Sequence, residues 1–258
     1  MLNAADPAAK VALSRALAAR WRAGGMTVGE ATPPPRPARP QRPELRMPRD
    51  MARRRKSGSA AGRIALLHAL AHIELNAVDL AWDLIARFHD AALPRLFFHD
   101  WLGVAAEEAE HFSLLSARLQ ALGSFYGALP AHDGLWEAAA ATALDLLGRL
   151  AVVPLVLEAR GLDVTPTMIL RLERAGDSDS AAILRIILRD EIGHVAVGVR
   201  WFRFLCRERG LDPQAVFQDR VRRYFGGALK PPFNRAARDH AGFPAEYYEP
   251  LACVARVS

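Results

Sequence analysis

The spacing of apolar residues predicts a chain built almost entirely of helices. From Ser59 onward apolar positions recur at i, i+3, i+4 and i+7, and no stretch alternates as a β-strand does. Together with Gly, Pro and capping residues, this pattern predicts helices over residues 60–89, 94–123, 135–160, 165–176 and 180–208. Four of these are long enough to span about 40 Å each. Matched lengths and short connections favour an antiparallel four-helix bundle.

Two segments of different character flank this region. Residues 5–23 predict a short helix with Leu13, Leu17 and Trp21 in one apolar stripe. Residues 31–57 are rich in proline and arginine and cannot be helical, so we expect them to be extended. Two interpretations stay open: a strap or linker along the body, or an arm that binds phosphate groups of nucleic acid.

The chain after Tyr224 is rich in proline, glycine and aromatic residues, which predicts an irregular C-terminal tail. We therefore expect an all-α protein in three parts. These are an N-terminal helix with a basic arm (1–57), a four-helix bundle (58–210) and a C-terminal extension (211–258).

Composition and charge exclude several classes of protein. The 258 residues are 51% hydrophobic and 24% charged, as in a soluble globular protein. Two cysteines without a CxxC pair exclude a disulfide scaffold and a Cys-built zinc or rubredoxin-type site. Residues 1–63 carry a net charge of +10 and the remainder −4, so the basic character belongs to the arm. No signal peptide is evident and the apolar stretch 146–157 is too short to span a membrane, so we expect a cytoplasmic protein.

Acidic residues and histidines interrupt the apolar faces of the four long helices. Two helices carry Glu-x-x-His in mid-face, and the other two carry one glutamate each. The six residues are Glu74, Glu108, His111, Glu158, Glu191 and His194. The alternative for any of these residues is a solvent-facing position or a salt bridge in the core. We interpret the nearby Glu107 and Glu110 as ordinary residues of the polar face.

The spacing of these residues places them at matching heights. Glu74 and Glu108 are 34 residues apart, and Glu158 and Glu191 are 33 apart. Each pair is centred on a predicted turn, and residues equidistant from the turn of an antiparallel hairpin lie level. Two facing hairpins would bring four carboxylates and two imidazoles together.

Burying four carboxylates without compensation would cost several kcal/mol each, whereas two divalent cations would neutralise them. One Glu from each of two helices with Glu-x-x-His from the other two is the ligand set of ferritin-like di-iron and di-manganese proteins. Beside these ligands, Asp190 could accept the proton of a ligand histidine and so fix its tautomer. His72 could pack behind the ligands and support them without binding the metal itself. A surface ion pair with Arg189 or Arg185 is the alternative for Asp190.

Several short motifs carry a resemblance to a known family. They are His72-Ile-Glu74, Glu108-Ala-Glu110-His111, Asp190-Glu191-x-x-His194, Leu229-Lys230-Pro231-Pro232-Phe233-Asn234 and Ala241-Gly242-Phe243. Over residues of about 35–250 the chain resembles an uncharacterised ferritin-like family, domain of unknown function 455. It is more distantly similar to the di-iron enzymes that hydroxylate prenylated adenosine in tRNA. Membership implies a di-iron four-helix bundle but no substrate.

From these features we expect an O₂-activating di-iron oxidoreductase, a hydroxylase or oxidase with two iron ions or a Mn/Fe pair. Its substrate would be a small molecule or a tRNA base, its electrons would come from an external donor, and a homodimer is possible. A non-catalytic metal-binding or ferroxidase-like protein is the other alternative. No tyrosine lies near the predicted ligands in sequence, which argues against a stored tyrosyl radical.

Overall fold

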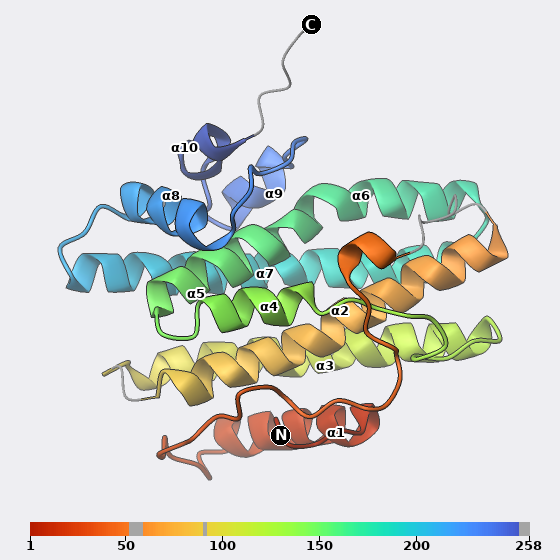
Figure 1. The fold of residues 1–258 in the computed structure, drawn as a ribbon, viewed down its shortest axis with the longest axis horizontal. Coiled ribbons are helices and arrows are strands. Elements are labelled where there is room, and N and C mark those ends of the chain that lie inside the picture. Colours follow the sequence, from red (N-terminus) through yellow and green to blue (C-terminus); the bar gives the residue numbers. More distant parts are fainter. Residues whose placement is uncertain (52–58, 90–91, 253–258) are drawn as a thin grey trace, which may run out of the picture. The chain divides into compact units, whose positions relative to one another are not determined.

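The computed structural model describes residues 1–51, 59–89 and 92–252, and over these residues it contains helices and no β-strand (Figure 1). The expectation of an all-α protein is therefore confirmed. The end of the basic arm, residues 52–57, lies outside the described residues. The elements are α1 (Pro7–Arg22), η1 (Pro48–Asp50), α2 (Ala60–Arg87), α3 (Arg95–Ala121), α4 (Gly134–Ala141), α5 (Leu146–Val152), η2 (Val153–Glu158), α6 (Ala159–Arg174), α7 (Ser178–Glu208), α8 (Pro213–Tyr224), α9 (Arg235–His240), α10 (Ala245–Tyr248) and η3 (Glu249–Leu251).

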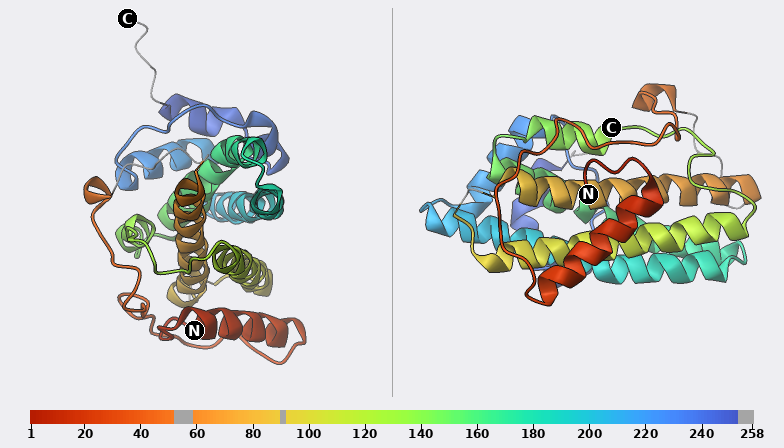
Figure 2. Two further views of the ribbon diagram at one scale, coloured as in Figure 1. Left: turned by 90° about the vertical axis from the view of Figure 1, so that its right-hand side faces the viewer. Right: turned by 90° about the horizontal axis from the view of Figure 1, so that it is seen from below.

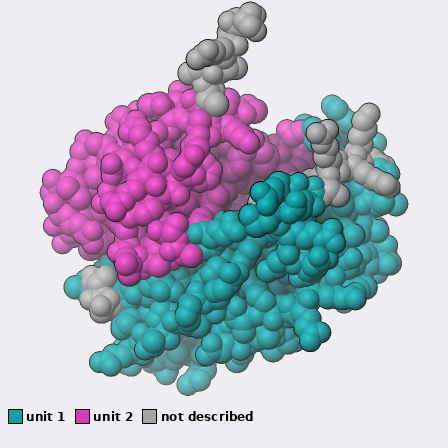
Figure 3. All heavy atoms as spheres, in the orientation of Figure 1, with its two compact units in different colours: residues 1–137, 169–184 teal, residues 138–168, 185–258 magenta. Residues whose placement is uncertain are grey.

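The chain forms two compact units, which Figure 3 shows in different colours. Unit 1 comprises Met1–Glu137 and Ile169–Leu184, and unit 2 comprises Ala138–Met168 and Arg185–Ser258. Helices α4, α6 and α7 each contribute residues to both units. The segments 1–57, 58–210 and 211–258 stay a prediction about the domains.

Helices α2 and α3 form the core of unit 1 as an antiparallel pair (Figures 1 and 2). Each contributes fully buried side chains to this core, such as Leu67 of α2 and Leu115 of α3. Helix α2 begins where the Ser59 hydroxyl accepts the N–H of Gly62, as expected of a capping serine. Helix α3 ends before Gly123, whose φ of +76° glycine adopts without strain. The first hairpin thus ends where the sequence predicts.

The buried face of α1 differs from the predicted apolar stripe. Leu13 is 42% exposed, whereas Lys10 and Ser14 lie in the interior. The Ser14 hydroxyl donates to the carbonyl of Ala105 and accepts from the indole N–H of Trp82. Polar residues are tolerated on this face because each has a partner in α2 or α3, which apolar spacing alone could not reveal.

The described part of the Pro/Arg-rich segment is an extended strap within unit 1. Leu45 pairs with Ala131 in an isolated bridge, and the N–H of Ala38 donates to the carbonyl of Leu2 at 2.8 Å. Arg36 forms an ion pair with Asp133. These contacts fix the strap to the body through its backbone and its charged side chains.

Helix α2 is the one helix among the described residues that is long and apolar enough to cross a membrane. Its most apolar 18-residue stretch has a mean hydropathy of 1.4, and 72% of that stretch is buried inside the protein. The core helix of a soluble protein has this character. The shorter apolar stretch 146–157 is divided between α5 and η2, and the cytoplasmic location stays a prediction.

Unit 2 contradicts the continuous helix predicted over 135–160. Helix α4 ends at Ala141, and α5 begins after Asp145, whose carboxylate accepts the N–H of Gly148. The π-helical turn η2 then joins α5 to α6 without a break at Gly161. The short helix expected to start at Thr165-Pro166 is instead the second half of α6.

Pro166 lies inside α6 because a distant residue replaces its missing hydrogen bond. Proline offers no N–H to the carbonyl four residues earlier, here that of Leu162. The side-chain amide of Asn234 donates to this carbonyl at 3.0 Å, and the Asn234 backbone N–H donates to Asp163. A proline that suggests a helix start in the sequence is thus accommodated by a partner more than 60 residues away.

After Tyr224 the chain is irregular apart from two short helices and a 3-10 turn, but it is ordered and packed rather than a loose tail. Helices α8, α9 and α10 follow one another from Pro213, and their aromatic side chains pack together in unit 2. Phe217, Phe243 and Tyr248 are fully buried, and the rings of Phe217 and Phe243 meet edge to face at 5.3 Å. The aromatic residues that made this segment look irregular form a small core of their own.

Candidate metal centre

Three of the predicted ligands gather in the interior of unit 1. Glu74 comes from α2, and Glu108 and His111 come from α3. Their exposed fractions are 3%, 0% and 0%. The Nδ1 atom of His111 lies 3.3 Å from Glu74 Oε2 and 3.5 Å from Glu108 Oε2. Potential ligand atoms of the three residues all lie within 4.8 Å of one another, so this buried cluster could hold a metal ion.

The local sequence explains why these polar groups are held inside. Glu108 and His111 are one turn apart on the same face of α3, and Ala105 and Phe112 on that helix are buried beside them. The hairpin register brings Glu74 of α2 to the same height, as the 34-residue spacing predicts. Apolar neighbours thus keep water away from two carboxylates and one imidazole.

The carboxylates of Glu74 and Glu108 favour a positive charge on the group that lies between them. Burial lowers the pKa of His111, but hydrogen bonds to Glu108 and Glu74 and the charges of both outweigh burial and raise it to about 11. The cluster therefore favours a cation between the carboxylates, whether a proton on His111 or a metal ion.

Unit 2 contains the second Glu-x-x-His pair. Glu191 and His194 lie on α7 with exposed fractions of 8% and 1%, and His194 Nδ1 is 3.8 Å from Glu191 Oε1. No group of three or more candidate ligands lies within unit 2 alone, as far as its described residues extend. The buried pair repeats the composition of the α3 pair.

Glu158 is the last residue of the π-helical turn η2, and it is half-buried. A single π turn inside an α-helical run is rare and is often found at functional sites. Gly198 of α7 lies against this turn, because a Cβ atom there would be 2.6 Å from the Cβ of Pro154. Only glycine allows α7 to approach the turn so closely, which explains this glycine in the middle of a helix.

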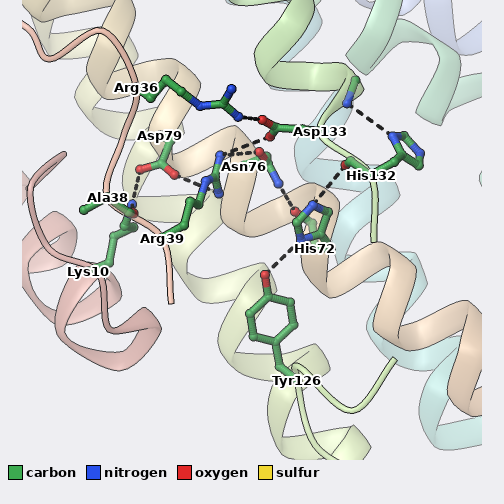
Figure 4. Close-up of polar contacts among 11 residues, drawn as sticks. Lys10, Arg36, Ala38, Arg39, His72, Asn76, Asp79, Tyr126, His132 and Asp133 are labelled. Atoms are coloured by element: carbon green, nitrogen blue, oxygen red, sulfur yellow. Dashed lines mark hydrogen bonds and ion pairs between the residues drawn. The ribbon is translucent and has the colours of Figure 1, made fainter. Parts of the chain in front are cut away.

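His72 takes part in a hydrogen-bonded network on α2 (Figure 4). Its Nδ1 is 2.9 Å from the hydroxyl of Tyr126, and its Nε2 is 3.1 Å from the carbonyl of His132. Because a carbonyl only accepts, Nε2 carries the proton and Nδ1 accepts from Tyr126. Burial, with the nearby Arg39 charge, lowers the pKa of His72 to about 4, so the ring is neutral. Both ring nitrogens have partners, and the predicted role behind the metal ligands stays a prediction.

The same network continues toward the N-terminus and was missed by the sequence analysis. Asp79 Oδ1 lies 2.5 Å from Lys10 Nζ, and its Oδ2 lies 3.1 Å from Arg39 Nη1 (Figure 4). Arg39 also donates to Asn76. The signal was present as the polar stripe His72, Asn76, Asp79 and Asp83 on an otherwise apolar helix. This stripe is where α1 and the strap attach to α2.

Tyr126, although distant in sequence from the predicted ligands, packs beside residues that neighbour them along the chain. Its ring stacks on His68 and His72 and meets Phe112 edge-on at 5.1 Å. Phe112 follows His111 in the sequence, and His72 is two residues before Glu74. The loop after α3 therefore returns this tyrosine to the turns that carry the ligands.

Asp190 forms an ion pair with its neighbour Arg189, with 2.8 Å between the Nε and Oδ1 atoms. This pair matches the surface alternative considered for Asp190 from the sequence. A role in orienting a ligand histidine stays a prediction.

Fold and site together define an all-α protein with a buried Glu/His cluster that could hold a metal ion. The chain belongs to the family described as "Protein of unknown function (DUF455)", whose profile matches residues 3–249. It is similar to an uncharacterized protein of Haemophilus influenzae, with 45% identity over 209 residues, covering 79% of this chain and 72% of the relative. No solved structure matches the chain.

Proposed function

We propose that the chain is an O₂-activating di-iron oxidoreductase built on a ferritin-like four-helix bundle. The observation that carries the proposal is the buried cluster of Glu74, Glu108 and His111 in unit 1. The equally buried pair Glu191 and His194 of α7 supports it by repeating the same donors.

Charge and donor chemistry favour two divalent cations of a particular kind. Four carboxylates supply four negative charges, which two divalent ions neutralise, and two neutral imidazoles complete the set. Oxygen-rich, nitrogen-poor ligands suit iron or manganese better than zinc or copper. The donors present therefore fit a di-iron or Mn/Fe pair.

Each residue has a proposed task in holding the ions. Glu74, Glu108, Glu158 and Glu191 would hold the ions through carboxylate oxygens, and His111 and His194 would each supply one nitrogen. Bound ferrous ions would supply the electrons that reduce O₂. The apolar faces of the helices around the cluster exclude water, and electrons for repeated turnover would come from an external donor.

The alternative of a tRNA substrate gains no support from the strap. Arg36 and Arg39, two cations of the proposed phosphate-binding arm, form ion pairs with Asp133 and Asp79 of the body. Their charges are therefore already compensated within unit 1, and a small-molecule substrate is the simpler proposal.

The test is to load the protein with ferrous ions without oxygen and then follow O₂ consumption with an electrode. We expect two iron ions per chain and O₂ uptake that continues while a reductant is supplied. Glu108→Ala and Glu191→Ala should each reduce iron content and uptake, whereas Glu107→Ala, an exposed neighbour, should not. A single stoichiometric burst that no reductant or candidate substrate prolongs would favour the ferroxidase-like alternative instead.

A further inference from the structure

Unit 2 contains a cavity of about 440 Å³ that takes no part in the proposed metal centre. Its walls come from the π turn and the start of α6 on one side. On the other side are the end of α8 and the segment 227–233 that leads to α9. A volume of this size is within the range of small-molecule sites in proteins.

The interior of the cavity is apolar. Leu155 and Val156 of the π turn, Leu229 and Phe233 of the later segment and Phe225 at the end of α8 contribute to its walls. Leu155 and Leu229 are themselves buried, with 1% and 6% exposure. A ligand that fills this space would therefore need an apolar body.

The charged groups of the cavity are unevenly compensated. Arg238 is 2% exposed and pairs with Asp163 through two hydrogen bonds of 2.9 and 2.7 Å, so these two charges cancel. Arg160 and Lys230 also line the cavity. Arg160 also lies 3.4 Å from Asp163 Oδ2, so one carboxylate faces two guanidinium groups, and with Lys230 the cavity keeps an excess of positive charge.

Arg160 and Lys230 are suited to hold an anionic group at the edge of the cavity. Arg160 has 38% of its side chain exposed, and its Nη1 already donates to the carbonyl of Lys230 at 2.6 Å, which anchors the guanidinium. Lys230 is exposed and forms no ion pair with any described residue. An anchored guanidinium beside an ammonium matches the planar, two-oxygen geometry of a carboxylate.

We propose that this cavity binds a small amphipathic carboxylate. Its unbranched apolar chain would fill the space between Leu155, Leu229 and Phe233, and its carboxylate would pair with Arg160 and Lys230 at the edge. None of the lining residues is a proposed metal ligand, so binding does not depend on the metal centre.

The experiment is isothermal titration calorimetry of the full chain with decanoate, with decan-1-ol as the uncharged partner of equal chain length. We expect saturable binding of one decanoate per chain and on the order of tenfold weaker binding of decan-1-ol, since one charge-assisted pair is lost. Treatment with a chelator should leave both affinities unchanged, which separates this site from the metal centre.

Variants locate the site. Lys230→Gln should remove most of the preference for decanoate while leaving decan-1-ol binding as it is, and Arg160→Gln should do the same unless it loosens the 227–233 segment. Ala228→Trp should block both ligands by filling the cavity. Arg171→Gln, an exposed arginine later on α6, serves as the matched control and should change neither affinity. Equal affinity for the acid and the alcohol, binding that Ala228→Trp leaves intact, or no saturable binding of decanoate would overturn the proposal.

Discussion

The buried ion pair between Lys10 and Asp79 should decide whether α1 stays attached to unit 1. The two side chains are 1% and 0% exposed, and their charged atoms are 2.5 Å apart. Burial lowers the pKa of Lys10 and raises that of Asp79, and in each case the opposite charge of the partner counteracts the shift. Asp79 also pairs with Arg39 at 3.1 Å, whereas the carbonyl of Ala38 is the other partner of Lys10.

Because Asp79 has a second cationic partner and Lys10 has no second anionic one among the described residues, the two single substitutions should lower the free energy of unfolding by different amounts. Asp79→Asn leaves two cations facing each other without a counter-charge, and breaking a buried pair in this way costs about 3–5 kcal/mol. Lys10→Met leaves Asp79 with Arg39 and removes one hydrogen bond between charged groups, which costs about 1.5–3 kcal/mol. The double variant Lys10→Met with Asp79→Leu replaces the pair by apolar groups and should recover most of the loss.

The assay is urea unfolding followed by circular dichroism at equilibrium, with the free energy of unfolding extrapolated to water. A variant in which α1 alone detaches should also lose protection of α1 amides in hydrogen exchange. An uncompensated buried charge would not be the cause if Asp79→Asn lowered the free energy of unfolding by less than Lys10→Met. The same holds if the double variant were no more stable than Asp79→Asn.

Two further predictions concern other parts of the fold. His68 is buried, and its Nε2 accepts the N–H of Gly127. Burial lowers the pKa of His68 to about 4. Between pH of about 6.5 and 4 the unfolded chain therefore binds a proton at this residue, whereas the folded chain does not. The free energy of unfolding should therefore fall by about 3 kcal/mol from this residue as the pH drops from 6.5 to 4, and His68→Gln should flatten the measured pH profile by that amount; parallel profiles would contradict it. On α7, Gly198→Ala should destabilise the folded protein by about 1–3 kcal/mol, because the new Cβ atom would clash with Pro154. Gly193→Ala should stabilise it by up to about 1 kcal/mol, because a Cβ atom there has no neighbour within 4 Å and alanine favours the helix. Thermal unfolding of the two variants side by side checks the pair, and equal shifts would show that the close approach of Gly198 to the π turn is not real.

The first hairpin could be read from the sequence because its signals are local. Ser59 caps α2, Gly123 ends α3, and the apolar period on both helices is regular enough for Glu74, Glu108 and His111 to stand out. Those interruptions stood out because burying charge is costly, so the cluster in unit 1 was visible as an anomaly in a regular pattern.

The features that the sequence did not reveal depend on partners far along the chain. Pro166 stays inside α6 because Asn234 bonds the carbonyl that the proline leaves open. Lys10 can face the core because Asp79 is there. The π turn that carries Glu158 lies where Gly198 passes close to Pro154. Each is a pairing between distant residues, and local periodicity contains no information about such pairs.

Anomalous diffraction from crystals of the iron-loaded protein, at the iron and manganese edges, would show whether the buried glutamates and histidines bind metal. We expect two anomalous peaks within reach of Glu74, Glu108, His111, Glu158, Glu191 and His194, and their loss in Glu108→Ala but not in Glu107→Ala. A structure with no peak beside the buried cluster, or with the metal bound elsewhere, would contradict this expectation.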